Sequence, residues 1–307
     1  MRIGVVGATG FIGGALMSSR TDGMDLVPLK APRLDTLSPS LDSVRRAALD
    51  PSLYAQLKMQ LLDVDVLVNA AGLANPGSRH RLSLWAANAA LPLALAVAAR
   101  DAHVARFVHV SSAAVQGRLT LNEEHEGSPE TDYATSKWIG ECLLHDLEWD
   151  GCVTYRPASV HGTSRPVTQR IVRLASSSRV VVAHPGDFPT PQAFIGNVAH
   201  AILTLATTST RVPPIVIHPS EGLTTSRFLR LMGDREPRKV PHHIAEQLIR
   251  AANGVGRVLP YMTAHARRLE MVMFGQHQEI SWLEDQGWQA PFVPQEWTHL
   301  IRRELAQ

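Results

Sequence analysis

The sequence predicts an α/β fold with a doubly wound parallel sheet and a smaller, mostly helical C-terminal region. Short apolar runs alternate with helical patterns through the first half of the 307 residues, and this alternation is typical of βαβ units. The apolar runs are continuous, as expected for parallel strands that are buried on both faces. After about residue 160, proline and glycine interrupt the chain often, and helical patterns follow from Thr224 to the end.

The expected elements can be placed in order along the first half of the chain. Strands are predicted at Ile3–Val6, Leu26–Leu29, Val64–Val68, Arg106–Val110 and Cys152–Tyr155. Helices are predicted at Phe11–Ser19, Leu41–Leu49, Leu82–Arg100 and Tyr133–Leu147. We expect a first domain over residues 1–160, to which segments near 194–218 return, and a second domain over residues 161–307.

Composition limits the classes of partner. The chain has 30 Lys and Arg residues against 28 Asp and Glu residues, so its charge gives no reason to expect nucleic acid or an anionic membrane surface. The apolar stretch Leu82–Ala99 contains Asn88 and Pro92, and it predicts a buried helix rather than a membrane span. No targeting segment is visible, so we expect a cytoplasmic protein. Neither the two cysteines, Cys142 and Cys152, nor the 14 histidines show metal-ligand spacing, so no metal site is expected.

A glycine-rich loop follows the first predicted strand. The segment GATGFIGG sets glycines at every third position directly after Ile3–Val6, at the start of a predicted helix. Such glycines let the backbone approach a pyrophosphate, and the helix N-terminus directs its N–H groups at the anion. A tight turn without a ligand uses glycine for steric freedom alone, but the strand–loop–helix context favours a dinucleotide site. The residues expected to form it are Gly7, Thr9, Gly10, Phe11, Ile12 and Gly13.

The second predicted strand ends in basic rather than acidic residues. An acidic side chain at this point hydrogen-bonds a ribose 2′-hydroxyl, whereas a basic one accommodates a 2′-phosphate. The segment LKAPRLD has Lys30 and Arg33 there. Both can be ordinary solvated charges, but no acid competes for the position. NADP(H) is therefore the favoured cofactor, with NAD(H) as the alternative.

Tyr133 and Lys137 lie four residues apart in a predicted helix, a spacing that places both side chains on one face. A tyrosine with a pKa of roughly 10 is a poor acid or base at neutral pH. A nearby ammonium favours the phenolate and brings the pKa toward the working range. The pattern alone usually means a packed tyrosine beside a solvated lysine, but downstream of a glycine loop it predicts proton transfer.

A serine pair follows the strand predicted at Arg106–Val110. Ligands bind at the carboxyl ends of the strands in sheets of this kind, so Ser111 and Ser112 are candidates for a site. A role in capping the strand end explains Ser111 well and Ser112 poorly.

These motifs resemble the extended short-chain dehydrogenases/reductases, a family of epimerases, dehydratases and ketoreductases with a Rossmann-type sheet. The resemblance depends on GATGFIGG, on the Tyr133–Lys137 pair and on the segment SSAAVQG, and DVLVNAAG, YRPASVHG and WLEDQGWQAP extend it over most of the chain. It implies catalytic roles for Ser112, Tyr133 and Lys137, and a structural role for Asn88. The further cofactor contacts that it implies are Asp35, Ala70, Ala71, Gly72, Tyr133, Lys137 and Pro157, with Asp35 in a short third strand.

Departures from the family pattern reduce the number of functions that the resemblance implies. Ala113 and Ala114 stand where sugar dehydratases of the family carry an Asp-Glu pair, so dehydration is not expected. Gln192 stands where an Arg of the family grips a nucleotide-sugar diphosphate, and a bidentate phosphate donor is lost. Arg165, Arg170 and Arg173 lie nearby in the sequence. They can substitute for that Arg, or they can be part of a solvated helix face.

The leading hypothesis is an NADPH-dependent ketoreductase that acts on a nucleotide-linked keto-sugar, bound as a small-molecule substrate by the C-terminal region. The alternatives are a nucleotide-sugar epimerase with retained NAD, a reductase of a non-sugar carbonyl, and a non-catalytic relative that binds NADP(H). Lys30 and Arg33 count against the epimerase, and the intact catalytic residues count against the non-catalytic relative. The resemblance also implies a homodimer, paired through the helices at Leu82–Arg100 and Tyr133–Leu147.

Overall fold

The computed structural model of the chain describes residues 1–19, 23–34, 38–73, 81–258 and 262–306. The chain divides into two compact units. Unit 1 comprises residues 1–117, 123–157 and 198–218, and unit 2 comprises residues 118–122, 158–197 and 219–307.

Unit 1 is built on a parallel sheet. In the described part of the chain its six strands are β1 (Arg2–Val6), β2 (Asp25–Leu29), β3 (Val66–Asn69), β4 (Arg106–Val110), β5 (Cys152–Arg156) and β9 (Ile215–Ile217). Their order is β2-β1-β3-β4-β5-β9, and every neighbouring pair is parallel. Every residue of β3, β5 and β9 is buried, as expected for strands with both faces covered.

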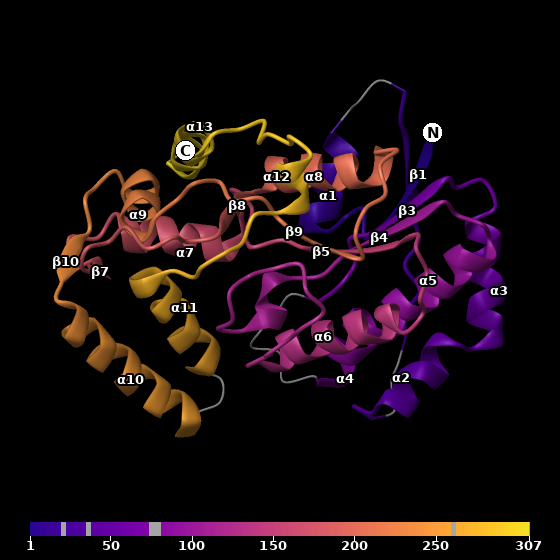
Figure 1. Ribbon diagram of the computed structural model, residues 1–307, viewed down its shortest axis with the longest axis horizontal. Coiled ribbons are helices and arrows are strands. Elements are labelled where there is room, and N and C mark those ends of the chain that lie inside the picture. The colour runs from indigo at the N-terminus through magenta and orange to yellow at the C-terminus, as the bar shows by residue number, and fades with distance from the viewer. Residues whose placement is uncertain (20–22, 35–37, 74–80, 259–261, 307) are drawn as a thin grey trace. The chain divides into compact units, whose positions relative to one another are not determined.

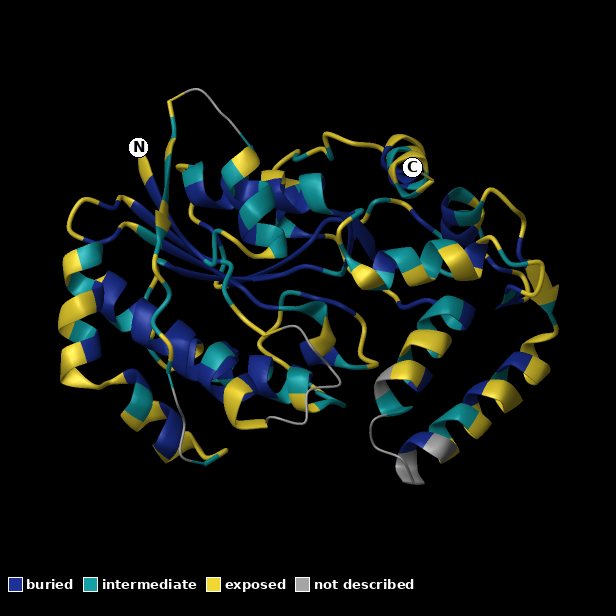
Figure 2. Cartoon of the chain, turned by 180° about the vertical axis from the view of Figure 1, so that it is seen from behind, coloured by how far each residue is buried: buried dark blue, intermediate teal, exposed yellow. Residues whose placement is uncertain are grey.

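Helices cover both faces of this sheet (Figure 1). One face carries α1 (Phe11–Ser18) and α8 (Ile195–Thr207), and the other carries α2 (Leu41–Ala48), α3 (Pro51–Gln60), α5 (Leu91–Asp101) and α6 (Asp132–His145). The strands and α5 hold much of the buried surface of this unit (Figure 2). The predicted α/β fold with a parallel sheet is confirmed.

Helix α3 was not predicted, although its start shows two ordinary signals. Asp50 is its N-cap, and Asp50 Oδ1 accepts hydrogen bonds from the N–H groups of Ser52 and Leu53 at 3.0 Å each. Pro51 occupies the first helical position, where the missing N–H costs nothing. The third strand expected at Asp35 falls outside the described residues, and in the described part of the sheet β2 is the edge strand.

A long apolar helical stretch runs through α4 (Arg81–Trp85), a π-helical segment η1 (Ala86–Ala90) and α5. By length and composition Arg81–Asp101 can cross a membrane, but 78% of its most apolar window is buried inside the structure. It packs against Leu53 and Leu57 of α3 in the main core cluster, as a core helix does. In α5 only Val97, Arg100 and Asp101 escape full burial.

Unit 2 combines short strands with helices. Strand β6 (Ser159–His161) pairs with β8 (Gln192–Phe194), and β7 (Val181–Ala183) pairs with β10 (Arg238–Val240), both parallel. Its further helices are α7 (Pro166–Ala175), α9 (Thr225–Gly233), α10 (His242–Val258), α11 (Thr263–Phe274), α12 (Trp282–Asp285) and α13 (Pro294–Leu305). Of the segments near 194–218 that were expected to return to the first domain, Val198–His218 belongs to unit 1, where Ile215–Ile217 forms β9 of the main sheet. Phe194 instead ends β8 of unit 2.

Candidate active site

The sequence-predicted site residues of unit 1 follow the carboxyl ends of its strands. Gly7 follows β1, Lys30 follows β2, Ala70 follows β3, Ser112 comes two residues after β4, and Pro157 follows β5. Because these strands are parallel, their carboxyl ends share one edge of the sheet, which is where open α/β sheets bind ligands.

The glycine loop joins β1 to α1 in a tight turn. Gly7 has a φ of +83°, and a Cβ there would lie 2.5 Å from the N atom of Ala71, so the loops after β1 and β3 touch. Thr9 and Gly10 are exposed, Phe11 and Ile12 are half-buried and Gly13 is buried. Gly10 is the N-cap of α1 without a side-chain cap, and the first turn of α1 has no acidic residue. Since first-turn N–H groups lack acceptors within their own helix, this loop fits the pyrophosphate of a dinucleotide.

The loop after β3 connects the glycine loop to Lys137. Ala70 donates its N–H to Val6 O at 2.9 Å, and Ala71 donates its N–H to Asn69 Oδ1 at 3.1 Å. A Cβ at Gly72 would lie 3.1 Å from Lys137 Nζ. The predicted residues Ala70, Ala71 and Gly72 therefore line the path between the glycine turn and the predicted catalytic lysine.

Lys137 is buried at the inner face of α6. Its Nζ donates a hydrogen bond to Val110 O, at the end of β4, over 2.9 Å. Burial lowers the pKa of Lys137 to about 8, while the Glu141 carboxylate acts in the opposite direction. An ammonium held against a strand end in this way keeps two further N–H donors for a ligand.

Tyr133 lies one turn before Lys137 and is half-buried. Thr131 caps this end of α6, its Oγ1 accepting a hydrogen bond from Ala134 N. Ser136 Oγ donates to Tyr133 O at 2.7 Å and accepts from Asn88 Nδ2 at 3.0 Å. The Asn88 amide also bonds both backbone groups of Leu73, at 3.0 Å each, so the expected structural role of Asn88 is to join η1, α6 and the loop after β3.

Ser112 begins the short 3-10 helix η2 (Ala113–Gln116) and is half-buried. Its Oγ accepts a hydrogen bond from Ala114 N at 3.2 Å, and a hydroxyl that accepts one bond still has its own hydrogen to donate. Ala113 donates its N–H to Pro157 O at 3.0 Å, which brings the ends of β4 and β5 together. The capping role falls to Ser112 rather than to Ser111, whose buried Oγ has no hydrogen-bond partner in the described part of the chain.

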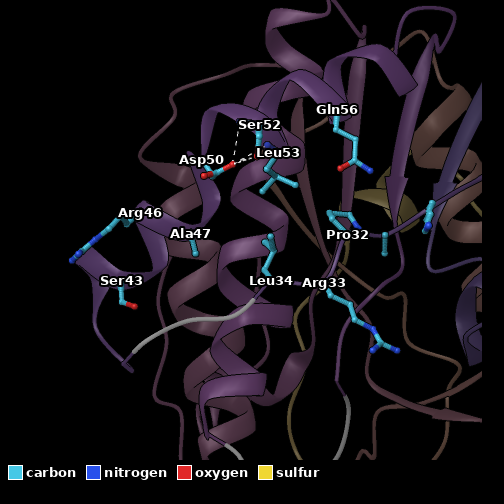
Figure 3. Close-up of a pocket in the computed structure, with 12 residues that line it drawn as sticks. Pro32, Arg33, Leu34, Ser43, Arg46, Ala47, Asp50, Ser52, Leu53 and Gln56 are labelled. Atoms are coloured by element: carbon cyan, nitrogen blue, oxygen red, sulfur yellow. Dashed lines mark hydrogen bonds between the residues drawn. The ribbon is translucent and has the colours of Figure 1, made fainter.

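Lys30 and Arg33 line a cavity of about 960 Å³ beside α2 and α3 (Figure 3). Both side chains are exposed. In Figure 3 Arg33 and Arg46 point away from one another, with Leu34 and Leu53 between them. Exposed cations at this point fit a 2′-phosphate, and Asp35 falls outside the described residues.

Two buried polar pairs near Lys137 had no role in the sequence analysis. Arg156, at the end of β5, forms an ion pair with Glu141, whose Oε2 lies 2.7 Å from Arg156 Nη2. His109 Nδ1 accepts a hydrogen bond from Asn69 Nδ2 at 3.1 Å, and burial holds the pKa of His109 well below its usual range, so the ring is neutral. Glu141 follows Lys137 by four residues, and that spacing is the signal that would have found it.

In unit 2, Gln192 is buried and engaged on both sides of its amide. Its Oε1 accepts a hydrogen bond from His161 Nε2 at 2.7 Å, and its Nε2 donates to Thr190 Oγ1 at 2.9 Å. Of the arginines named as substitutes, Arg165 donates to Val160 O and Arg173 donates to Gln169 O. Gln192 is therefore part of a buried hydrogen-bond network in unit 2.

The glycine turn at the N-terminus of α1 and the buried Lys137 both lie at the carboxyl-terminal edge of the parallel sheet, where sheets of this kind bind ligands. The model of the NAD dependent epimerase/dehydratase family matches residues 3–217, and the chain belongs to this family. It is an NAD(P)-dependent enzyme of the extended short-chain dehydrogenase/reductase type. None of the curated protein sequences matches the chain.

Solved structures of similar fold include reductases and epimerases. The dTDP-4-dehydrorhamnose reductase from Bacillus anthracis, in complex with NADP, is 16% identical over 99% of this chain and 98% of its own, with a TM-score of 0.67. The UDP-glucuronic acid 4-epimerase from Bacillus cereus, in complex with NAD, is 15% identical over 99% and 100%, with a TM-score of 0.66. RMD from Pseudomonas aeruginosa, complexed with NADPH, is 18% identical over 100% of both chains, with a TM-score of 0.62.

Proposed function

We propose that this protein is an NADP(H)-dependent carbonyl reductase with Ser112, Tyr133 and Lys137 as its catalytic residues. The observation that supports this most is the buried Lys137, one turn from Tyr133 on α6 and bonded to the end of β4. A lysine with a pKa of about 8 is mostly an ammonium at neutral pH, and an ammonium near a phenol makes the phenol a more effective acid.

The three side chains divide the work at the carbonyl oxygen. Ser112 donates its hydroxyl hydrogen to that oxygen and orients it. Tyr133 gives its phenolic proton to the same oxygen, and Lys137 stabilises the phenolate that remains. A bound nicotinamide cofactor supplies the hydride to the carbonyl carbon. Lys137 would hold the ribose of that cofactor with its remaining N–H donors.

A nucleotide-linked keto-sugar is the substrate class that we propose first. It is supported by the similarity to a dTDP-4-dehydrorhamnose reductase and by the family to which the chain belongs. A non-sugar carbonyl is the second candidate, because Gln192 is committed to His161 and Thr190 rather than to an anion. For the cofactor we propose NADP(H) over NAD(H), since Lys30 and Arg33 are exposed on one cavity at the end of β2.

Replacing Tyr133 by Phe tests the catalytic assignment. We expect NADPH consumption with keto-sugar nucleotides or simple ketones to fall by about 10²- to 10⁴-fold, because the general acid is gone. The dissociation constant of NADPH should change little. Tyr54→Phe is the matched control, since the Tyr54 hydroxyl of α3 donates to Asp101 at the C-terminal end of α5. Equal turnover in Tyr133→Phe and wild type would contradict the assignment.

The identity of the retained cofactor separates the reductase from the epimerase. Mass spectrometry of small molecules released from the denatured protein should show NADP(H) or no cofactor, as expected for an exchanging reductase. Stoichiometric NAD would favour the nucleotide-sugar epimerase instead.

A further inference from the structure

Glu141 continues the face of α6 that carries the proposed catalytic pair. Tyr133, Lys137 and Glu141 are spaced by four residues, so they lie in one row along the helix. Lys137 is 4% exposed and Glu141 is 2% exposed. The carboxylate is therefore placed one turn beyond a buried ammonium, with no bulk water between them to screen the interaction.

Arg156 holds the Glu141 carboxylate in place. Its Nη2 and Nε lie 2.7 Å and 3.1 Å from Glu141 Oε2. Its Nη1 donates to the backbone carbonyl of Glu124 at 3.0 Å, and its Nη2 to that of Glu126 at 3.5 Å. One guanidinium thus joins the end of β5, the inner face of α6 and the chain segment that lies between Ser112 and Tyr133.

Stability alone does not account for a charged pair at this place. A buried ion pair loses its hydration, and well-packed apolar residues of similar volume often serve stability as well or better. The pair gives what apolar residues cannot: a directional link between three elements and a fixed negative charge beside Lys137. In the described part of the chain, the other charged or titratable groups around Lys137 include Tyr133 on the same helix, the Arg156 cation paired with Glu141, and His109 of β4, which burial keeps neutral.

We propose that Glu141, oriented by Arg156, is a positioning residue that keeps the buried Lys137 in the ammonium form from one helical turn away. The inference rests on the proposed function for the catalytic roles of Tyr133 and Lys137. The carboxylate offsets the desolvation of the buried ammonium, so Lys137 keeps its proton at neutral pH. Without it, Lys137 becomes neutral at a lower pH and the phenolate of Tyr133 loses its counter-charge.

The composition of the chain allows a direct test. It has four lysines, Lys30, Lys58, Lys137 and Lys239, so protein labelled with ¹³C-lysine gives four side-chain signals, and Lys137→Arg identifies the one of interest. In Glu141→Gln we expect the titration midpoint of Lys137 to fall by about one pH unit or more, while the other three stay unchanged. Asp146→Asn is the matched control, because Asp146 lies at the end of the same helix in an exposed ion pair with Arg45; it should leave Lys137 unchanged.

A second variant guards against misfolding. Glu141→Gln leaves the Arg156 guanidinium buried beside a neutral amide, whereas Glu141→Gln/Arg156→Gln removes both charges. The titration midpoint of Lys137 should fall in the double variant too. The single variant Glu141→Asp keeps a carboxylate at this position, so its midpoint should stay near that of wild type. A midpoint equal to that of wild type in the folded double variant would overturn the proposal.

Activity measurements separate this proposal from the proposed function. If the wild-type protein reduces a carbonyl, the alkaline limb of its pH–rate profile should move to lower pH in Glu141→Gln and stay unmoved in Asp146→Asn. A shifted Lys137 signal in a protein that turns over no carbonyl compound would overturn the reductase and leave the role of Glu141 toward Lys137 intact. If the wild-type protein turns over a carbonyl compound but the Lys137 signal does not shift in Glu141→Gln, the role of Glu141 is overturned and the reductase stands.

Discussion

Gly7 meets two demands that no other residue meets together. Its φ of +83° lies in the left-handed region, and its missing Cβ leaves room for the backbone of Ala71, 2.5 Å from where that atom would be. The first demand is one of torsion and the second is one of space. The glycine that we expect to bind the cofactor is therefore also required by the fold, whether or not a cofactor is bound.

Gly7→Ala and Gly14→Ala form a pair that separates these demands from helix propensity. Gly7→Ala should lower the free energy of unfolding by about 2 kcal/mol or more, through backbone strain and the clash with Ala71. Gly14 lies inside α1, where the nearest atom to an added Cβ is Ala8 O at 3.8 Å, so Gly14→Ala should raise stability by up to about 1 kcal/mol. Urea unfolding of the two variants without cofactor checks both signs; equal stabilities would contradict this account.

Among the elements, the contact between α6 and η1 fixes the position of the proposed catalytic helix. Gly140 lies against the π-helical segment, and a Cβ there would come within 2.2 Å of Asn88 O. The side chain of Asn88 bonds Ser136 one turn earlier on α6. Backbone proximity and a buried amide thus hold the two helices together, just behind Tyr133 and Lys137.

Gly140→Ala should weaken this contact. Because the obstacle is backbone, it moves only with the helix, and we expect a loss of about 1–3 kcal/mol in the free energy of unfolding. The displaced α6 should also lower carbonyl reduction more than it lowers NADPH binding, which in our proposal depends on the glycine loop as well as on Lys137. Gly254→Ala on α10 has open space around the added Cβ and serves as the control; a loss of the same size there would argue against a specific contact.

The sequence predicted the strands with continuous apolar runs, but α3 was missed despite the local signals at its start, and the contacts that depend on packing were missed too. The strands β1, β3, β4 and β5 were found within two residues because continuous apolar runs mark buried parallel strands. The π-helical segment at Ala86–Ala90 was not predicted, although Pro92 follows it and has no N–H to donate to Asn88 O, four residues earlier. The candidate site was predicted residue by residue from spacing and family resemblance, yet the Arg156–Glu141 pair was not, because its partners meet only in three dimensions.

At the scale of whole units, each one has its own apolar core, and that of unit 2 surrounds a histidine. The His161 ring stacks on Trp297 at 6.0 Å and contacts Phe228 at 5.2 Å. Gln192 Nε2 bonds Thr190, so Gln192 Oε1 faces His161 and accepts from its Nε2, while His161 Nδ1 accepts from Thr168 Oγ1 at 3.3 Å. Because Nε2 donates and Nδ1 accepts, these hydrogen bonds require the neutral form of the His161 ring.

Acid should therefore destabilise unit 2 through His161. Burial lowers the pKa of His161 from 6.5 to about 4, so as the pH falls below 6.5 the unfolded chain takes up a proton that the folded chain refuses. This contribution of the neutral ring to the free energy of unfolding is fully present above pH 6.5 and is lost between pH 6.5 and about 4. The loss at pH 4.5 is about 2 to 3 kcal/mol.

His161→Gln should remove this part of the pH dependence. Urea unfolding at pH 7 and pH 4.5 measures it, with His299→Gln, an exposed histidine of α13, as the control. If His161→Gln and His299→Gln lost stability equally between the two pH values, the buried ring would not be the acid-sensitive group.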